Sequence, residues 1–206
     1  RTGVRFFSSG RYQPARSVFE AILGQDPQNP TARYYLSRTI TRLTGGQVEG
    51  LMARARKLHG AGRYQEASAA YREVLRVNPG YEPARTGLAQ ARREQSDAHV
   101  RAARGQERAG RPYEAVKSLQ SALRVLPGNE TASARLRALR ARLQPRVRND
   151  LSTGILYYEE RRYPQAIQVF ENILLAAPGH KEANEYLRLS RRKLEALRRL
   201  RSEDAG

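Results

Sequence analysis

The sequence predicts an all-α fold, an α-solenoid of about 11–12 stacked antiparallel helices without strands. The main observation is a pattern of turn, helix and proline that recurs four times: Gly-Arg-Tyr or a close variant, then Ala, then Pro 12 residues after the Ala. The four prolines, Pro27, Pro79, Pro127 and Pro178, are spaced 52, 48 and 51 residues apart. The second observation is that no stretch alternates apolar and polar residues as a half-buried strand does. The repeat is therefore helical and about 50 residues long.

The segment between the Ala and the Pro is a helix because its apolar residues recur at steps of three and four. In the second repeat these residues are Ala67, Ala70, Tyr71, Val74 and Leu75. The fourth repeat has the equivalent residues Ala166, Val169, Phe170, Ile173 and Leu174. The Pro ends the helix because the residue before it is displaced from helical geometry. We name this segment the second helix of each repeat.

A third helix begins after each Pro, and a first helix precedes each turn. The third helices share an Ala and Leu pair: Ala32 and Leu36, Ala84 and Leu88, Ala132 and Leu136, Ala183 and Leu187. Asn29 and Asn129 are candidate N-caps of these helices. We expect breaks between a third helix and the next first helix at Gly45-Gly46, Ser96-Asp97 and Pro145. The second break is the weakest, and residues 82–109 are also compatible with one long helix.

A single repeat is too thin to bury its own apolar faces, so stacked repeats should form one continuous core. We expect one domain over residues 1–206, with repeats at about 1–45, 46–95, 96–144 and 145–201. The chain starts with Arg1-Thr2-Gly3, without Met and within a helical pattern. We therefore expect it to be a fragment of a longer protein.

The pattern resembles the tetratricopeptide repeat, whose second helix carries an Ala, an aromatic residue four positions later and a Pro 12 positions after the Ala. The matching sets are Ala15, Phe19 and Pro27; Ala67, Tyr71 and Pro79; and Ala166, Phe170 and Pro178. The third repeat has Leu119 at the aromatic position, and Gly154 with Tyr157 matches the Gly-x-x-Tyr of the family's first helix. Family repeats have 34 residues, whereas these have an added third helix.

The resemblance implies a scaffold or adaptor that holds a peptide or protein domain in a groove lined by first helices. By register, the residues on the groove side are Met52, Arg56, His59, Arg104, Arg148, Leu151, Ile155 and Tyr158. The alternative is that the third helix of a neighbouring repeat buries several of them. One member of each aromatic doublet, such as Tyr34-Tyr35, should face the core and the other should point elsewhere.

The chain is strongly basic, with a formal net charge of +18, 38 Lys and Arg and 20 Asp and Glu. Only Lys57, Lys117, Lys181 and Lys193 are lysines, so the other 34 basic residues are Arg. Residues 85–148 carry 15 basic and 5 acidic residues, a net charge of +10. Codon usage in a GC-rich genome explains this as well as selection for an acidic partner does. Tyr113 is the only aromatic residue in that stretch, which disfavours stacking on single-stranded nucleic acid.

No catalytic, metal or cofactor site is predicted. The chain has no Cys, and the three histidines, His59, His99 and His180, lack the spacing of metal ligands. The Glu159-Glu160 pair is followed by Arg161-Arg162 and is a solvated charge cluster. No apolar run approaches the roughly 20 residues of a membrane span. A Cys-free soluble domain fits the cytoplasm and the periplasm equally, so the compartment stays open.

We therefore expect a non-enzymatic scaffold that binds another protein or peptide, an acidic one if the arginines are functional. The first alternative is binding of nucleic acid or an anionic membrane through the Arg-rich face. The second alternative is a self-assembling structural module of a larger envelope or secretion-associated protein.

Overall fold

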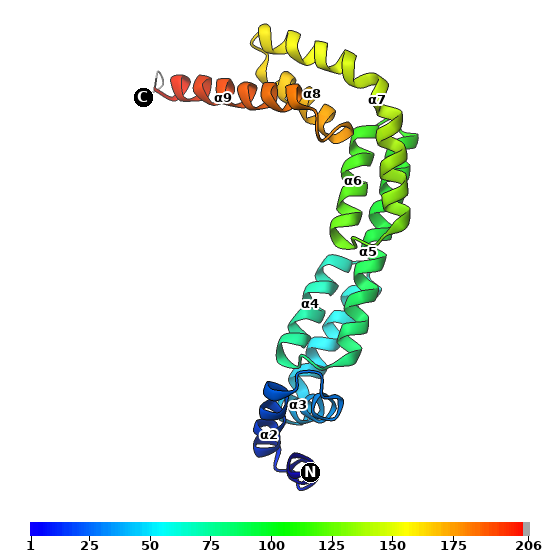
Figure 1. Cartoon of the computed structure of the whole chain (residues 1–206), viewed down its shortest axis with the longest axis vertical. Coiled ribbons are helices and arrows are strands. Elements are labelled where there is room, and N and C mark those ends of the chain that lie inside the picture. The colour runs from blue at the N-terminus through cyan, green and yellow to red at the C-terminus, as the bar shows by residue number, and fades with distance from the viewer. Residues whose placement is uncertain (204–206) are drawn as a thin grey trace. The chain divides into compact units, whose positions relative to one another are not determined.

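The computed structural model describes the backbone of residues 1–203 and the side chains of residues 1–200. Over these residues the chain is helical and contains no strand, which confirms the predicted all-α fold (Figure 1). The helices are α1 (Thr2–Ser8), α2 (Tyr12–Gln25), α3 (Pro30–Gly60), α4 (Tyr64–Val77), α5 (Glu82–Arg108), α6 (Pro112–Val125), α7 (Glu130–Glu159), α8 (Tyr163–Ala176) and α9 (Lys181–Glu203).

These nine helices are fewer than the 11–12 predicted, because a third helix and the next first helix run on as one element in α3, α5 and α7. The predicted break at Gly45-Gly46 is present as a kink, since Gly45 has φ 20° and ψ −99°. The break predicted at Pro145 is wrong. At Ser96-Asp97 the helix is continuous, which confirms the alternative of one long helix over about residues 82–109. Ser96 is buried within α5, where its hydroxyl donates to the Ala122 carbonyl at 2.9 Å. Pro145 lies inside α7 and does not end it.

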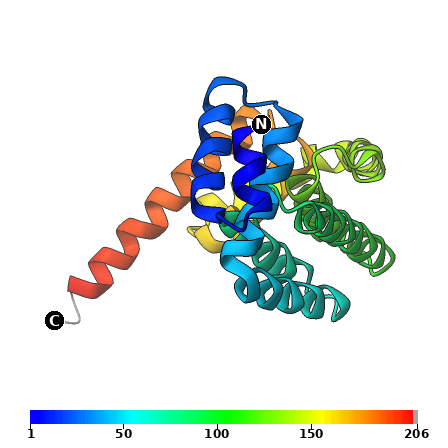
Figure 2. The same cartoon turned by 90° about the horizontal axis from the view of Figure 1, so that it is seen from below.

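The chain divides into two compact halves, residues 1–95 and residues 96–206, with the boundary inside α5. In the N-terminal half, α2 packs against α1 and against the first part of α3 (Figure 2), and α4 packs with the second part of α3 and the first part of α5. In the C-terminal half, α6 packs with α5 and α7, and α8 packs with α7 and α9. Each second helix is therefore flanked by a first and a third helix.

The aromatic residue of the second helix fills the space between its two neighbours. A Cβ added to Gly3 would lie 2.8 Å from the Phe19 ring, and one added to Gly154 would lie 2.6 Å from the Phe170 ring. On the opposite side Phe19 stacks on Tyr35 and Phe170 stacks on Tyr186, each at a centroid distance of 5.5 Å. Each phenylalanine ring therefore contacts a glycine of the first helix on one side and a tyrosine ring of the third helix on the other. The first-helix position must be glycine, because any side chain there would overlap the phenylalanine ring.

The second repeat exchanges these roles. Ala55 takes the first-helix position, and the glycine is now Gly87 on the third helix, where an added Cβ would lie 2.5 Å from the Tyr71 ring. In the third repeat Leu119 occupies the aromatic position and is fully buried in the core that also contains Ala103. The total side-chain volume around the aromatic residue stays similar, because the first helix has the larger residue in this repeat and the third helix has the glycine.

Caps and turns fix the ends of the helices. The predicted N-caps are confirmed, since Asn29 Oδ1 and Asn129 Oδ1 accept from the backbone N–H groups of Ala32 and Ala132, each at 3.0 Å. His180 does the same for α9, because its Nδ1 lies 3.2 Å from the Ala183 nitrogen. These caps satisfy backbone donors that have no partner inside the helix.

A hydrogen bond between two side chains joins α6 to the second part of α7. The Tyr113 hydroxyl donates to Asp150 Oδ2. Burial raises the pKa of the Tyr113 hydroxyl, and the hydrogen bond and charge of Asp150 raise it further. The neutral form of Tyr113 is therefore the form that the folded chain favours.

The glycine–aromatic contact predicts opposite effects for two Gly→Ala changes in the C-terminal half. Gly154→Ala should lower the free energy of unfolding by about 1–3 kcal/mol, because the new methyl group overlaps the Phe170 ring. Gly105→Ala is the control, because nothing lies within 4 Å of its added Cβ. It should stabilise α5 by about 0.5–1 kcal/mol through helix propensity. Denaturant unfolding measures both, and equal effects of the same sign would contradict the packing described.

The Tyr113 contact predicts loss of stability in alkali. Its pKa is raised above the unfolded value of about 10, so its contribution is complete below that pH and is lost as the pH rises through the folded pKa. Tyr113→Phe should lower the free energy of unfolding by about 1 kcal/mol at neutral pH. The same change should flatten the decline of stability above about pH 10. Denaturant titrations across this range test both effects, and an unchanged alkaline decline would count against the contact.

Candidate partner-binding groove

The site residues predicted from the first helices of the N-terminal half do not share an exposed surface. Met52 is 4% exposed and belongs to the hydrophobic core. His59 is also engaged, with a side chain 14% exposed and ring nitrogens 3.3 Å from the Tyr71 hydroxyl and 3.1 Å from Glu94 Oε2. Hydrogen bonds from Gln90 and His59 hold the pKa of Glu94 below its ordinary value. Only Arg56 of this group is exposed.

The predicted residues of α7 are mostly covered. Leu151, Ile155 and Tyr158 are half-buried and pack against the core. The Tyr158 ring meets Tyr186 of α9 at 5.5 Å, so the third helix of the same repeat covers it. The two remaining predicted groove residues are exposed: Arg148 on α7 and Arg104 on α5.

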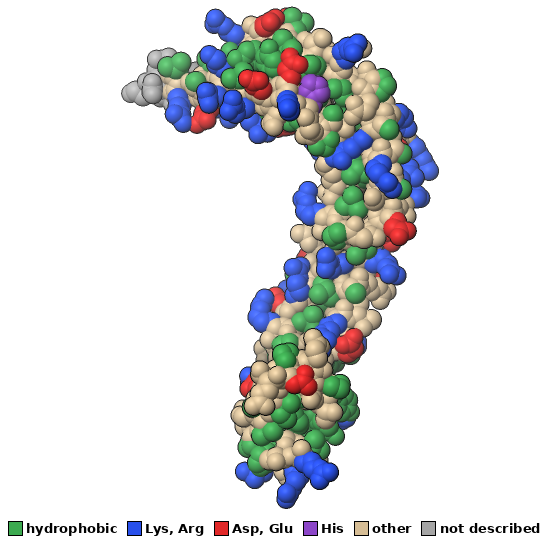
Figure 3. Space-filling model, in the orientation of Figure 1, with side chains coloured by type: hydrophobic (Ala, Val, Ile, Leu, Met, Phe, Trp, Pro, Cys, Tyr) green, Lys and Arg blue, Asp and Glu red, His purple; other side chains and the backbone are tan. Residues whose placement is uncertain are grey.

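A groove of about 670 Å³ lies elsewhere, in the N-terminal half between α2, the first part of α3 and the end of α4. Its apolar lining is Leu23, Leu36, Ile40, Leu43, Val77 and Pro79. Hydrophobic side chains also gather on the face of this half that is turned to the viewer in Figure 3. The groove is therefore built from a second helix, the third helix after it, and the end of the next second helix.

Asn78 holds this corner together. Its side chain is fully buried, and its Nδ2 donates to the Ser37 carbonyl at 2.9 Å and to Thr41 Oγ1 at 2.8 Å. These bonds fasten the end of α4 to the middle of α3. Asn78 also lines the groove, and its Oδ1 is buried without a donor among the residues that the structure describes. A buried acceptor without a donor costs about 1–3 kcal/mol.

Tyr34 stands at the edge of the groove with 53% of its surface exposed. Arg38 supports it, with its guanidinium 5.6 Å from the ring centroid and a 2.6 Å hydrogen bond to the hydroxyl. A second hollow of about 610 Å³ shares Tyr34 with the groove and is also lined by Tyr81 and Pro83. Tyr34 is thus an exposed aromatic residue that borders two hollows.

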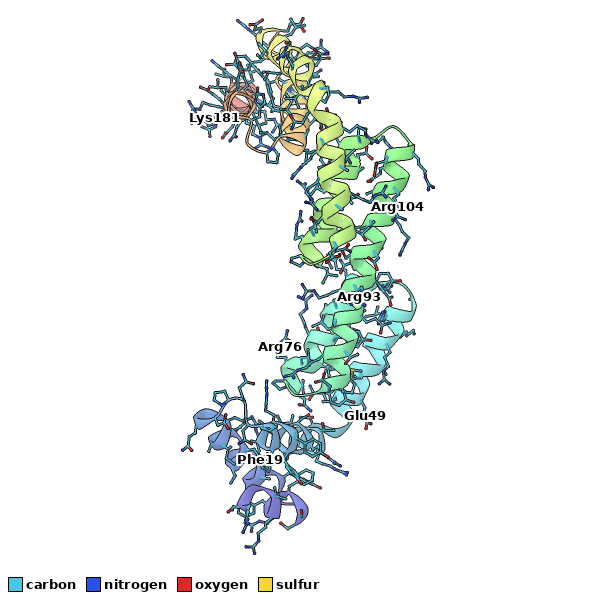
Figure 4. The ribbon with its side chains drawn as sticks, turned by 45° about the vertical axis from the view of Figure 1, so that its right-hand side comes forward. Phe19, Glu49, Arg76, Arg93, Arg104 and Lys181 are labelled. Carbon is cyan, nitrogen blue, oxygen red and sulfur yellow. The ribbon has the colours of Figure 1, made fainter. Side chains whose placement is uncertain are left out.

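The charged residues of the groove give it a net charge of +2. They are Arg16, Arg33, Arg76, Arg85, Glu20 and Glu82. Both carboxylates already have partners, since Glu20 pairs with Arg16 at 2.7 Å and Glu82 with Arg85 at 3.6 Å. Arg33 donates to Gln28, whereas Arg76, at the end of α4, has no partner among the described residues (Figure 4). Arg33 and Arg76 therefore give the groove its positive charge.

The sequence did not predict this groove, because the predicted site residues were taken from the register of the first helices and the groove is lined by second and third helices. The Tyr34-Tyr35 doublet is the sequence feature that indicates this surface, since it predicts one tyrosine ring in the core and one exposed. Tyr35 stacks on Phe19, and Tyr34 is the exposed member. The contribution of Val77, Asn78 and Pro79 comes from a different repeat, and only the fold brings it to Tyr34.

The repeated helical hairpins and the surface groove define a helical repeat protein. A sequence model of the tetratricopeptide repeat family matches residues 1–43. The same turn, alanine and proline recur in register as far as Pro178, so the similarity to this family continues beyond the matched residues, with repeats of about 50 residues. Folds of this family typically serve protein–protein interaction and not catalysis.

No curated protein matches the sequence. Among solved structures, the tetratricopeptide repeat domain of P58(IPK) is similar at 15% sequence identity with a TM-score of 0.27. The match covers 94% of this chain and 64% of that chain, so the present chain spans less than two thirds of its length.

Two features are absent from residues 1–203. None of their helices combines the length and the apolar character of a membrane span. Their His, Asp and Glu side chains form no group of three or more that could hold a metal ion.

The role of Asn78 predicts a loss of stability on truncation. Asn78→Ala should lower the free energy of unfolding of the N-terminal half by about 2 kcal/mol, because it removes two buried hydrogen bonds and leaves a void. Gln65→Ala, at an exposed position of α4, should change it by less than about 0.5 kcal/mol. Denaturant unfolding followed by hydrogen exchange of α3 and α4 measures both, and equal effects would show that Asn78 does not fasten this corner.

Proposed function

We propose that the chain is a scaffold that binds an extended acidic segment of a partner protein in the groove of the N-terminal half. The observation that carries the proposal is the combination of an apolar floor, an exposed Tyr34 at the edge and a net positive lining. Grooves of this size with a few convergent polar groups are typical of ligand sites.

The apolar floor and Tyr34 support burial of apolar side chains from the partner. Tyr is favoured at interfaces because its ring gives contact area at a small entropic cost and its hydroxyl stays hydrated. Arg38 already holds the Tyr34 ring in place, so little side-chain freedom is left to lose.

Asn78 supports a groove that is formed before the partner arrives. Its buried side chain joins the end of α4 to the Ser37 carbonyl and to Thr41 Oγ1 of α3. The partner alone then loses conformational freedom on binding.

The charge of the lining supports an acidic partner. Within the described part of the chain, Arg33 and Arg76 have no carboxylate partner, whereas Arg16 and Arg85 do. Carboxylates on the partner would pair with these two guanidinium groups, mainly raising the association rate at low salt.

Selection of peptides from a random display library on the intact chain tests the proposal. Enriched peptides should combine Asp or Glu with large apolar residues. Tyr34→Ala and the double change Arg33→Glu with Arg76→Glu should each weaken binding of a selected peptide by about tenfold or more.

The matched control is Leu156→Ala, which removes another apolar side chain that is 51% exposed, in the other half of the chain. It should leave the affinity unchanged. Enrichment of basic peptides, or equal losses in Tyr34→Ala and Leu156→Ala, would contradict the proposal. Binding of duplex RNA or heparin that outcompetes every selected peptide would instead favour the nucleic-acid alternative.

A further inference from the structure

The geometry points to a second binding site, for a phosphate group, in the C-terminal half. A hollow of about 420 Å³ between α5 and α7 is lined by Arg104, Glu107, Arg108, Arg135 and Arg142. A smaller hollow of about 260 Å³ shares Glu107 and Arg142 and adds Arg146. Together the two contain five guanidinium groups and one carboxylate, a net charge of +4. This site is separate from the peptide groove and does not depend on it.

Among the residues that the structure describes, Glu107 is the only acidic residue lining the two hollows, and its contacts to arginine are long. One of its oxygens lies 3.3 Å from Arg135 and the other lies 3.3 Å from Arg142, so neither pair has the two parallel short bonds of a bidentate contact. The Glu107 side chain is only 18% exposed, so it is largely shielded from bulk solvent. The Glu107 carboxylate thus makes one long contact to each of two guanidinium groups, and the other N–H donors of both groups do not bond to it.

The other arginines have donors to spare. Arg104 and Arg108 are exposed, one helical turn apart on α5, and have no ion-pair partner among the described residues (Figure 4 labels Arg104). Several like charges around one hollow repel each other, and an anion bound among them would relieve that repulsion.

A phosphate group meets these requirements better than a single carboxylate would. It carries close to two negative charges at neutral pH and offers three acceptor oxygens, which matches planar guanidinium groups arriving from both α5 and α7. The same recognition applies to the free ion and to a phosphate ester, so the experiment includes both.

The test uses the intact chain and isothermal titration with inorganic phosphate and with N-acetyl-phosphoserine amide, at an ionic strength held constant with chloride. Arg104→Gln with Arg108→Gln should weaken binding by about tenfold or more, because the change removes two positive charges and their hydrogen-bond donors from the hollow. Glu107→Gln should strengthen binding several-fold, because it frees Arg135 and Arg142 and removes the competing anion.

The matched control is Arg124→Gln with Arg137→Gln, which lowers the net charge equally at two exposed positions of the same half outside both hollows. It should leave the affinity within about twofold, since exposed charges at a distance are screened. Binding of both probes supports a site for the phosphate group itself, and binding of the phosphoserine probe alone supports a site for esterified phosphate. No binding at millimolar concentration, an equal loss in the control, or weaker binding in Glu107→Gln would overturn the proposal.

Discussion

The packing of one second-helix side chain between two flanking helices is the contact on which each repeat depends. Phe19, Tyr71, Leu119 and Phe170 take this position, and all are buried. A ring can enter only where one neighbour has little or no side chain, which explains Gly3, Gly87 and Gly154. The other neighbour then carries the volume, as Tyr35 and Tyr186 do. Three helices are therefore fixed at the distance that this side chain sets.

The same contact explains how repeats are joined. The third helix is needed to cover the second-helix ring, and in α3, α5 and α7 it runs on into the next first helix. Polar side chains then secure the junctions inside each half: Asn78 bonds to Ser37 and Thr41, and Asn129 donates to Ser96 at 2.8 Å. The groove beside Asn78 is a product of this junction, since it lies where the end of one second helix reaches the third helix of the preceding repeat.

Much of the fold could be predicted from the sequence. The turn, alanine and proline predicted the second helices, and Asn29 and Asn129 were correctly predicted as N-caps. Helix ends and caps are predictable because they depend on the local backbone and the residues next to it. The helix count was too high because Ser96 and Pro145 look like breaks locally. Tertiary packing overrides that preference, with Ser96 buried and bonded to the Ala122 carbonyl.

The candidate sites were harder to predict. The register of the first helices predicted that Met52 and Tyr158 line the groove. Met52 instead lies in the core, and α9 covers Tyr158. Periodicity tells which residues face the same side of one helix, but not which neighbour will cover that side. The basic stretch at 85–148 did mark the region of the second site. The sequence could not show that Arg104 and Arg142 meet around Glu107, because they are on different helices.

The central claim is that the N-terminal half has a preformed groove for an acidic segment. The most direct measurement is the change in NMR chemical shifts when a selected acidic peptide is added to the isotope-labelled chain. The account predicts the largest changes at Tyr34, Ile40 and the side-chain amide of Asn78, without changes in the helical shifts of α3 and α4. Changes concentrated on α7 and α8, or loss of helical shifts in α3 and α4 on binding, would contradict it.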